Sequence, residues 1–333
     1  MTAVDVHAHY IPPAALERLR QAPECGVEIA GWGADGPQLK FGNASPSRPI
    51  IKELLDLDER KSTLEKKNLQ HQVLSTWLDT VGYNLPVEQG CRWSRLLNVS
   101  LRAALNERGR ASSFSAIATV PLQSGERAAE ELEFAVKECG CLGVTIGTHV
   151  NGKNLDDRSL EPFWRAAERL NVPIIVHPFF PLGSERLGSY FLTHVVGLTA
   201  ETTLAAMSLY CGGVIDRFPD LKIILCHGGG FFPYQFGRLD RARETRDDIK
   251  KATRRAARAV VSWFHYDTIL FEPEVLEFLI SEAGADHVLL GSDCPFGIGD
   301  PDPTRIVSAA RVSEEDKEKI LSGNARRLFR VPA

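Results

Sequence analysis

Eight short, mostly apolar segments alternate with amphipathic segments along the 333-residue chain, and this alternation constrains the fold more than any other feature. Apolar runs of this length between turn-forming residues are typical of buried parallel strands, whereas apolar residues spaced three and four apart indicate helices. We therefore expect strands at Ala3–His7, Gln72–Trp77, Ser115–Val120, Gly143–Ile146, Pro173–His177, Lys222–Cys226, Trp263–Tyr266 and Val288–Gly291.

Helical patterns fill the stretches between these strands. The clearest helices are expected at Arg127–Cys139, Leu160–Leu170, Ala200–Asp216 and Pro273–Ala283. Strands that alternate with helices form right-handed βαβ units around a parallel sheet, and eight such units close into a (β/α)8 TIM barrel. An open doubly wound sheet is the alternative, but no glycine-rich dinucleotide motif follows the first strand. The sequence therefore predicts an α/β fold of the (β/α)8 class.

One region interrupts the alternation, between residues 14 and 50. It contains GVEIAGWGADGPQLKFG, in which two β-like runs flank a Gly-Ala-Asp-Gly-Pro turn. This pattern predicts a β-hairpin. We expect a single domain over residues 1–333, with 14–50 as a small insertion after the first strand that sits over one barrel mouth.

The composition excludes several classes of protein. With 44% hydrophobic residues and a formal net charge of −4, the chain gives no reason to expect a nucleic-acid or membrane partner. No apolar run approaches the ~18 residues of a membrane span, and no basic segment precedes an apolar core at the N-terminus. Its seven cysteines form no disulfide framework. We therefore expect a cytoplasmic protein with reduced thiols.

Metal-binding and acid–base residues follow the predicted strands. His7 and His9 end the first strand, and their spacing of two places both imidazoles on one face. His177 ends the fifth strand, His227 follows the sixth, and Asp293 follows the eighth. Each of these residues alone could be an ordinary loop or capping residue. Because the carboxyl ends of barrel strands meet at one mouth, their coincidence indicates a functional site.

The residue types narrow the chemistry of this site. Three histidines and an aspartate suit a single metal ion with an open position for a substrate oxygen. A two-metal site often uses a modified lysine at the end of the fourth strand, and GVTIGTHV contains no lysine. His227, followed by three glycines, is better suited to acid–base chemistry than to metal binding, because histidine titrates near neutral pH.

These residues and their surroundings resemble a known family. The motifs, in chain order, are DVHAHYIP, VPLQ, GVTIGTHVNGKNLDD, VPIIVHP, AETTLA, LKIILCHGGGFFPYQFGRLD and GSDCPFGIGD. The ordered set is similar to the amidohydrolase superfamily, in particular to its metal-dependent decarboxylase branch typified by α-amino-β-carboxymuconate-ε-semialdehyde decarboxylases.

The resemblance implies roles for the polar residues. It implies one Zn²⁺ per subunit, with Mn²⁺ or Co²⁺ as alternatives that the ligand set also tolerates. It implies catalytic roles for His227 as the acid–base residue and for Asp293. The metal ligands that it implies are His7, His9, His177 and Asp293.

The resemblance also implies the substrate-binding residues and a partner. Arg48 and Arg238 would bind substrate carboxylates, since guanidinium groups donate paired hydrogen bonds to them. Arg238 would come from the neighbouring subunit of a homodimer, and the substrate would be a small acid carrying more than one carboxylate. The aromatic substrate-binding residues that it implies are Phe179, Phe191 and Phe296.

The chain departs from the family pattern around this pocket. Phe179 and Phe180 stand where the family has Trp-Asp, Phe191 replaces a tryptophan, and Cys294 replaces a tyrosine. Phenylalanine keeps an apolar wall but loses the indole N–H donor. These differences concern the choice of substrate more than the reaction.

The predicted function is non-oxidative, metal-dependent decarboxylation. The substrate expected first is 2-amino-3-carboxymuconate-6-semialdehyde or a close relative, with release of CO2. The same site could also serve a metal-dependent hydrolase or hydratase acting on a ring-cleavage product or aromatic acid. A non-catalytic binding barrel is the third reading, which the presence of His227 beside a full ligand set disfavours.

Overall fold

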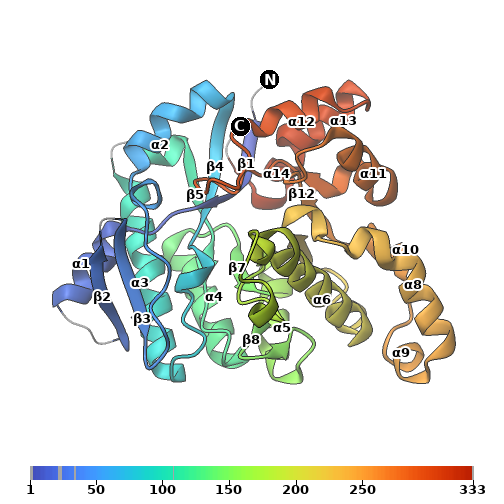
Figure 1. Cartoon of the computed structure of the whole chain (residues 1–333), viewed down its shortest axis with the longest axis horizontal. Helices are drawn as coiled ribbons and strands as arrows, with labels where there is room; N and C mark the ends of the chain where they lie inside the picture. Colours follow the sequence, from blue (N-terminus) through green and yellow to red (C-terminus); the bar gives the residue numbers. More distant parts are fainter. Residues whose placement is uncertain (1–2, 22–24, 34, 108, 332–333) are drawn as a thin grey trace.

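The computed structural model describes residues 3–21, 25–33, 35–107 and 109–331, and within them eight parallel strands form a barrel (Figure 1). In order around the barrel they are β1 (Ala3–His9), β4 (Leu69–Ser75), β5 (Phe114–Ala116) with β6 (Ala118–Thr119), β7 (Val144–Gly147), β10 (Pro173–His177), β11 (Lys222–Leu225), β12 (His265–Asp267) and β13 (Val288–Leu289). The predicted α/β barrel is confirmed.

Two junctions close the barrel. At the first, β5 and β6 form one strand that changes partner at Ile117, whose N–H donates to β4 while the N–H of Ala118 donates toward β7. At the second, the end of the chain returns to its beginning, where Val6 donates to Leu290 and Asp293 donates to His7, both at 2.9 Å. The second junction places the segment after β13 beside the two histidines of β1.

Helices surround the strands. Local sequence accounts for several boundaries: Ser124 caps the first turn of α4, and Gly140 ends that helix in a left-handed conformation. The main helices are α2 (Leu57–Leu64), α3 (Val87–Asn106), α4 (Gly125–Cys139), α5 (Glu161–Leu170), α6 (Leu198–Cys211), α7 (Val214–Arg217), α8 (Phe232–Thr245), α9 (Asp247–Ala252), α10 (Ala257–Val261), α11 (Pro273–Ala283), α12 (Pro303–Ala309), α13 (Glu314–Glu318) and α14 (Asn324–Phe329).

Some predicted elements differ from the observed ones. The helix expected at 200–216 is broken into α6 and α7, because Gly213 adopts a φ of 68° and a Cβ there would lie 2.2 Å from the carbonyl oxygen of Ala252. The seventh strand was predicted to end at Tyr266, but β12 continues to Asp267. The additional residue, Asp267, contacts His7 in the site described below.

The insertion contains the predicted hairpin. After α1 (Pro13–Gln21), β2 (Val27–Gly33) pairs antiparallel with β3 (Gly36–Phe41). Its apolar residues form a second core with Trp93 of α3, at the left of Figure 1. The residues that follow β3 line the main cavity of the barrel. The single-domain assignment stays a prediction.

Two observations bear on the environment of the protein. Among the described helices, none has the length and apolar character needed to cross a membrane. None of the seven cysteines, all of which are among the described residues, forms a disulfide bond. The cytoplasmic location stays a prediction.

Candidate metal centre and active-site cavity

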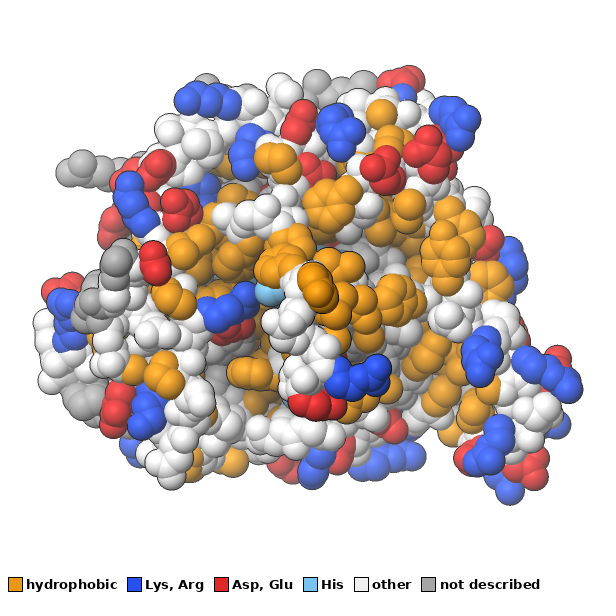
Figure 2. Space-filling view, in the orientation of Figure 1, with side chains coloured by type: hydrophobic (Ala, Val, Ile, Leu, Met, Phe, Trp, Pro, Cys, Tyr) orange, Lys and Arg blue, Asp and Glu red, His pale blue; other side chains and the backbone are white. Residues whose placement is uncertain are grey.

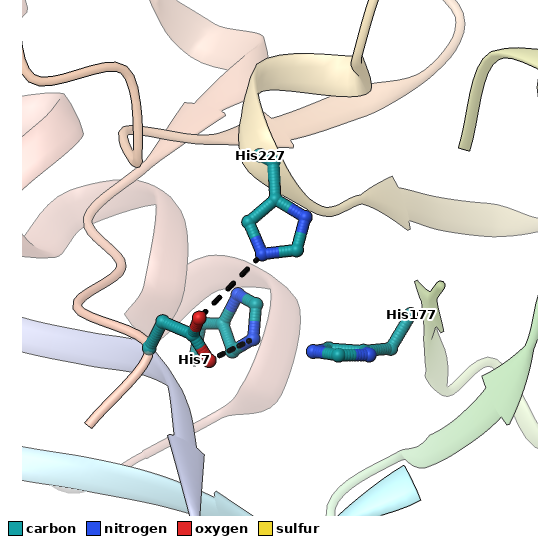
Figure 3. A group of neighbouring side chains, drawn as sticks. His7, His177 and His227 are labelled. Atoms are coloured by element: carbon teal, nitrogen blue, oxygen red, sulfur yellow. Dashed lines mark ion pairs between the residues drawn. The ribbon is translucent and has the colours of Figure 1, made fainter. Parts of the chain in front are cut away.

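Four predicted ligands converge at the carboxyl ends of the strands. Nε2 of His7 lies 3.2 Å from Nε2 of His9, and the Oδ1 atom of Asp293 lies 3.4 Å and 3.1 Å from these two nitrogens. The His177 ring centroid lies 5.0 Å from that of His7 and 4.9 Å from that of His9. All four side chains are buried. Figure 3 shows the rings of His7, His177 and His227 pointing toward one another.

The opposite ring nitrogens of the three histidines are held by oxygen atoms. Nδ1 of His7 lies 2.7 Å from a carboxylate oxygen of Asp267, and Nδ1 of His9 lies 3.1 Å from the hydroxyl of Ser75. Nδ1 of His177 lies 2.9 Å from the carbonyl oxygen of the next residue. Because carboxylate and carbonyl oxygens only accept, Nδ1 of His7 and of His177 carries the hydrogen and Nε2 presents a lone pair. Contacts of this kind orient metal-binding histidines.

Burial and neighbouring groups favour the ligating forms of His177 and Asp293. Burial, together with His9 and His7, holds the pKa of His177 well below its ordinary value, so its imidazole is neutral. Burial alone would raise the pKa of Asp293, but the imidazoles of His227, His9 and His7 around its carboxylate hold this pKa well below its usual range. His177 and Asp293 are therefore in the forms that bind a divalent metal. For His7, burial lowers the pKa, but Cys226 and the hydrogen bond with Asp267 raise it well above its ordinary value, so metal binding there would displace a proton.

These residues fit a metal ion. Nε2 of His177 is buried and has no hydrogen-bond partner among the described residues. Zinc ligands lie about 2.0–2.2 Å from the metal, which separates neighbouring ligand atoms by roughly 3.0–3.5 Å. The separations between His7, His9 and Asp293 fall in this range. Converging lone pairs at such distances repel one another, and a cation bound between them would relieve this repulsion.

His227 lies at the edge of this centre. Its Nε2 is 3.7 Å from Oδ2 of Asp293, and its ring centroid is 5.5 Å from those of His7 and His177. Its backbone has a φ of 55°, and the three glycines that follow also have positive φ. A Cβ at Gly230 would lie 2.1 Å from a backbone oxygen of α6, so the turn that carries His227 requires glycine there.

A cavity of 1670 Å³ opens above the metal centre. Of the predicted substrate-binding residues, Arg48, Phe179, Phe191 and Phe296 line it. Arg238 does not line it: this residue is exposed on α8. In Figure 2 a histidine is visible near the middle of this face, with hydrophobic side chains gathered around it.

Several aromatic rings line the cavity. Phe296 lies between the metal centre and Trp77, with ring centroids 5.4 Å from His9 and 5.7 Å from Trp77. Phe179 stacks on His149 at 4.8 Å, and Phe191 stacks on His194 at 3.9 Å. Flat apolar surfaces of this kind suit a planar, unsaturated or aromatic substrate.

Sequence reasoning missed several residues of the site. Asp267 and Ser75 orient ligands, and both stand at strand ends where the rule that identified the other residues could have found them. His149 lies in the two-residue strand β8 (His149–Val150), outside the barrel, and His194 and Asp79 lie in short irregular helical turns, so none of the three has such a signal.

Sequence comparisons relate this chain to known enzymes. A family profile described as Amidohydrolase matches residues 98–331. A 2-amino-3-carboxymuconate-6-semialdehyde decarboxylase of Dictyostelium discoideum is 34% identical over 280 residues, covering 84% of this chain and 77% of the relative. A gamma-resorcylate decarboxylase of Polaromonas sp. is 32% identical and covers 95% of this chain and 98% of its own length.

A solved structure has the same fold. The dihydroxybenzoic acid decarboxylase of Polaromonas sp. JS666, determined with bound manganese and the inhibitor 2-nitroresorcinol, superposes with a TM-score of 0.80. The two sequences are 24% identical, and the match covers 99% of this chain and 97% of the other.

Proposed function

This chain belongs to the amidohydrolase family, and from that membership and its cavity we propose that it is a metal-dependent, non-oxidative decarboxylase of a small planar carboxylic acid. The observation that carries the proposal is a single one. His227 stands beside the four proposed ligands His7, His9, His177 and Asp293, at the floor of a cavity lined by aromatic rings. Decarboxylation needs these parts, since a proton must replace the departing carboxyl group.

The residues divide the reaction between them. His7, His9, His177 and Asp293 would hold the metal. A bound divalent metal supplies positive charge that binds substrate oxygen and stabilises developing negative charge. The aromatic wall holds the substrate plane and excludes water.

The proton comes from His227. Its ring N–H gives a proton to the carbon that bears the carboxylate, the bond to the carboxyl carbon breaks, and CO2 leaves. The electron pair of the broken bond stays on the substrate carbon as its new C–H bond. Asp293, 3.7 Å from the His227 Nε2 atom, faces the ring that donates the proton.

Zinc is our first choice of metal, with Mn²⁺ and Co²⁺ as alternatives. The manganese bound in the Polaromonas enzyme supports a divalent ion without deciding between them. The sequence resemblance puts 2-amino-3-carboxymuconate-6-semialdehyde first among candidate substrates, and the Polaromonas relatives add dihydroxybenzoic acids.

We expect CO2 release from these acids by zinc- or manganese-loaded protein and none after removal of the metal by chelation. Gas release and product mass should be measured together, and reloading the metal should restore turnover. A product heavier than the substrate by one water would instead identify a hydratase or hydrolase. No turnover on the whole panel by metal-loaded protein would contradict an enzymatic role for these acids.

We also propose that the enzyme is a homodimer in which Arg238 enters the partner's cavity. Two features support this arrangement. Arg238 is exposed on α8 and has no role in its own cavity. Large apolar side chains are exposed on the rim of the mouth, among them Leu182 at 79% and Tyr190 at 91%, and such patches mark protein interfaces.

Mixed dimers test the role of Arg238. Arg238→Gln and His227→Ala should each be nearly inactive alone. After unfolding and refolding together, they should recover about a quarter of wild-type activity, because half of the dimers are hybrids with one complete site in two. Recovery near zero from hybrids shown to form would place Arg238 outside the partner's site, and a monomeric mass near 36.8 kDa would contradict the dimer.

A further inference from the structure

Arg48 is the only Lys or Arg among the described residues that line the main cavity, and its guanidinium is already engaged. Its Nε atom donates to Oδ2 of Asp79 at 2.8 Å and its Nη2 atom donates to Oδ1 at 3.1 Å. This paired geometry is the one in which arginine binds a substrate carboxylate. The Nε–Nη2 edge of the guanidinium is therefore already occupied by a carboxylate of the protein itself.

Two further side chains hold the guanidinium in place. Its carbon lies 4.9 Å from the ring centroid of Trp77, and its Nη1 atom lies 3.2 Å from Nε2 of His194. Arginine can only donate, so Nε2 of His194 accepts and the ring hydrogen lies on Nδ1. Nδ1 is buried and has no partner among the described residues. We refer to Arg48, Trp77, Asp79 and His194 as the Arg48 cluster.

The charges of the Arg48 cluster cancel. Asp79 is negative, Arg48 is positive, and with its hydrogen on Nδ1 His194 is neutral. A second carboxylate on a substrate would lie against the Arg48 cluster, which has no net positive charge. It would also compete with Asp79 for the guanidinium of Arg48. A neutral hydroxyl or carbonyl oxygen on the substrate would bring no second charge and therefore no such competition.

We propose that Asp79 is a specificity-determining residue, which holds Arg48 so that the cavity selects acids with one carboxylate and a neutral oxygen substituent over dicarboxylic acids. The inference deepens the proposed function and rests on it for the reaction. It places hydroxylated aromatic monocarboxylic acids ahead of 2-amino-3-carboxymuconate-6-semialdehyde, which carries two carboxylates. A dicarboxylic substrate would need its additional cation from elsewhere, such as Arg238 of a second subunit.

Binding by the metal-loaded protein tests this selectivity without turnover. Calorimetric titration with benzoate and with isophthalate compares one carboxylate with two on the same ring. Asp79→Asn keeps the side-chain shape but removes its charge, which leaves the guanidinium net positive. The dissociation constant of isophthalate, divided by that of benzoate, should fall by about tenfold or more in this variant. An unchanged ratio would overturn the proposal. Asp79→Ser provides a second variant should the amide disturb folding.

Two controls isolate the effect. In an Arg48→Gln background, Asp79→Asn should leave the ratio unchanged, and a shift there would show that Asp79 does not act through Arg48. Asp248→Asn removes the same charge from a similarly paired carboxylate, whose oxygens lie 3.2 Å and 2.9 Å from Nε and Nη2 of Arg246 in the exposed segment at α9. An equal shift in that variant would also overturn the proposal, because the effect would then be one of total charge.

The outcome separates this inference from the proposed function. A shifted ratio in a protein that releases no CO2 would support the role of Asp79 in selectivity and contradict the proposed decarboxylase activity. Metal-dependent CO2 release with an unchanged ratio would leave the decarboxylase standing and contradict the role of Asp79.

Discussion

Replacement of His227 by Ala should lower kcat by about 10²–10⁴ while the metal remains bound, because the variant loses the proton donor but none of the four proposed ligands. KM should change little, since the aromatic wall and Arg48 remain. Steady-state kinetics on the substrate found by the CO2 assay, together with metal analysis by mass spectrometry, measures both quantities. A loss of rate at full metal content is the expected result.

A second variant controls for backbone strain. His227 has a φ of 55°, a conformation that asparagine tolerates better than alanine. His227→Asn should therefore fold at least as well as the alanine variant and be equally slow. Wild-type turnover in either variant would show that another group supplies the proton. Loss of the metal would show that His227 is a ligand, an arrangement that its position within 4.8 Å of the ligand atoms of His7, His177 and Asp293 permits.

The sequence predicted the barrel well because the determining pattern is local. Each buried strand is a short apolar run, and β10 has the bounds that its Ile-Ile-Val run indicated. Parallel strands in a barrel all end at the same mouth, so polar residues that follow the strands are expected to lie together. This reasoning identified His7, His9, His177, His227 and Asp293. No contact between distant residues had to be known for this step.

Long-range pairing is what the sequence could not predict. Arg48 and Asp79 are 31 residues apart and lie in different loops, so nothing local indicates that they meet. From the sequence alone, Arg48 was expected to bind a carboxylate of the substrate. That expectation favoured a substrate with more than one carboxylate. Asp79 changes that expectation. Asp267 was missed for a smaller reason, since the predicted strand stopped one residue short of it.

Replacement of His177 by Ala should weaken metal binding by more than about 100-fold and abolish turnover. Loss of an outer-shell partner typically costs 10–100-fold in metal affinity, and loss of a ligand costs more. His177 is the most informative ligand to remove, because its Nε2 has no hydrogen-bond partner among the described residues and its only evident role is toward a cation. Competition with a chelating dye measures the affinity.

His149→Ala is the matched control for this variant. His149 is another histidine of the same cavity, stacked on Phe179 and distant in sequence from every proposed ligand. It should retain the wild-type metal affinity, although it removes the same imidazole from the cavity. Equal losses in both variants would point to damage to the cavity wall.

Full metal affinity in the His177 variant would remove His177 from the ligand set, and a fourth protein ligand would then have to be His227. In that case the proton donor assigned to the reaction would be lost as well, so this variant and the His227 variants together decide which histidine binds the metal and which moves the proton.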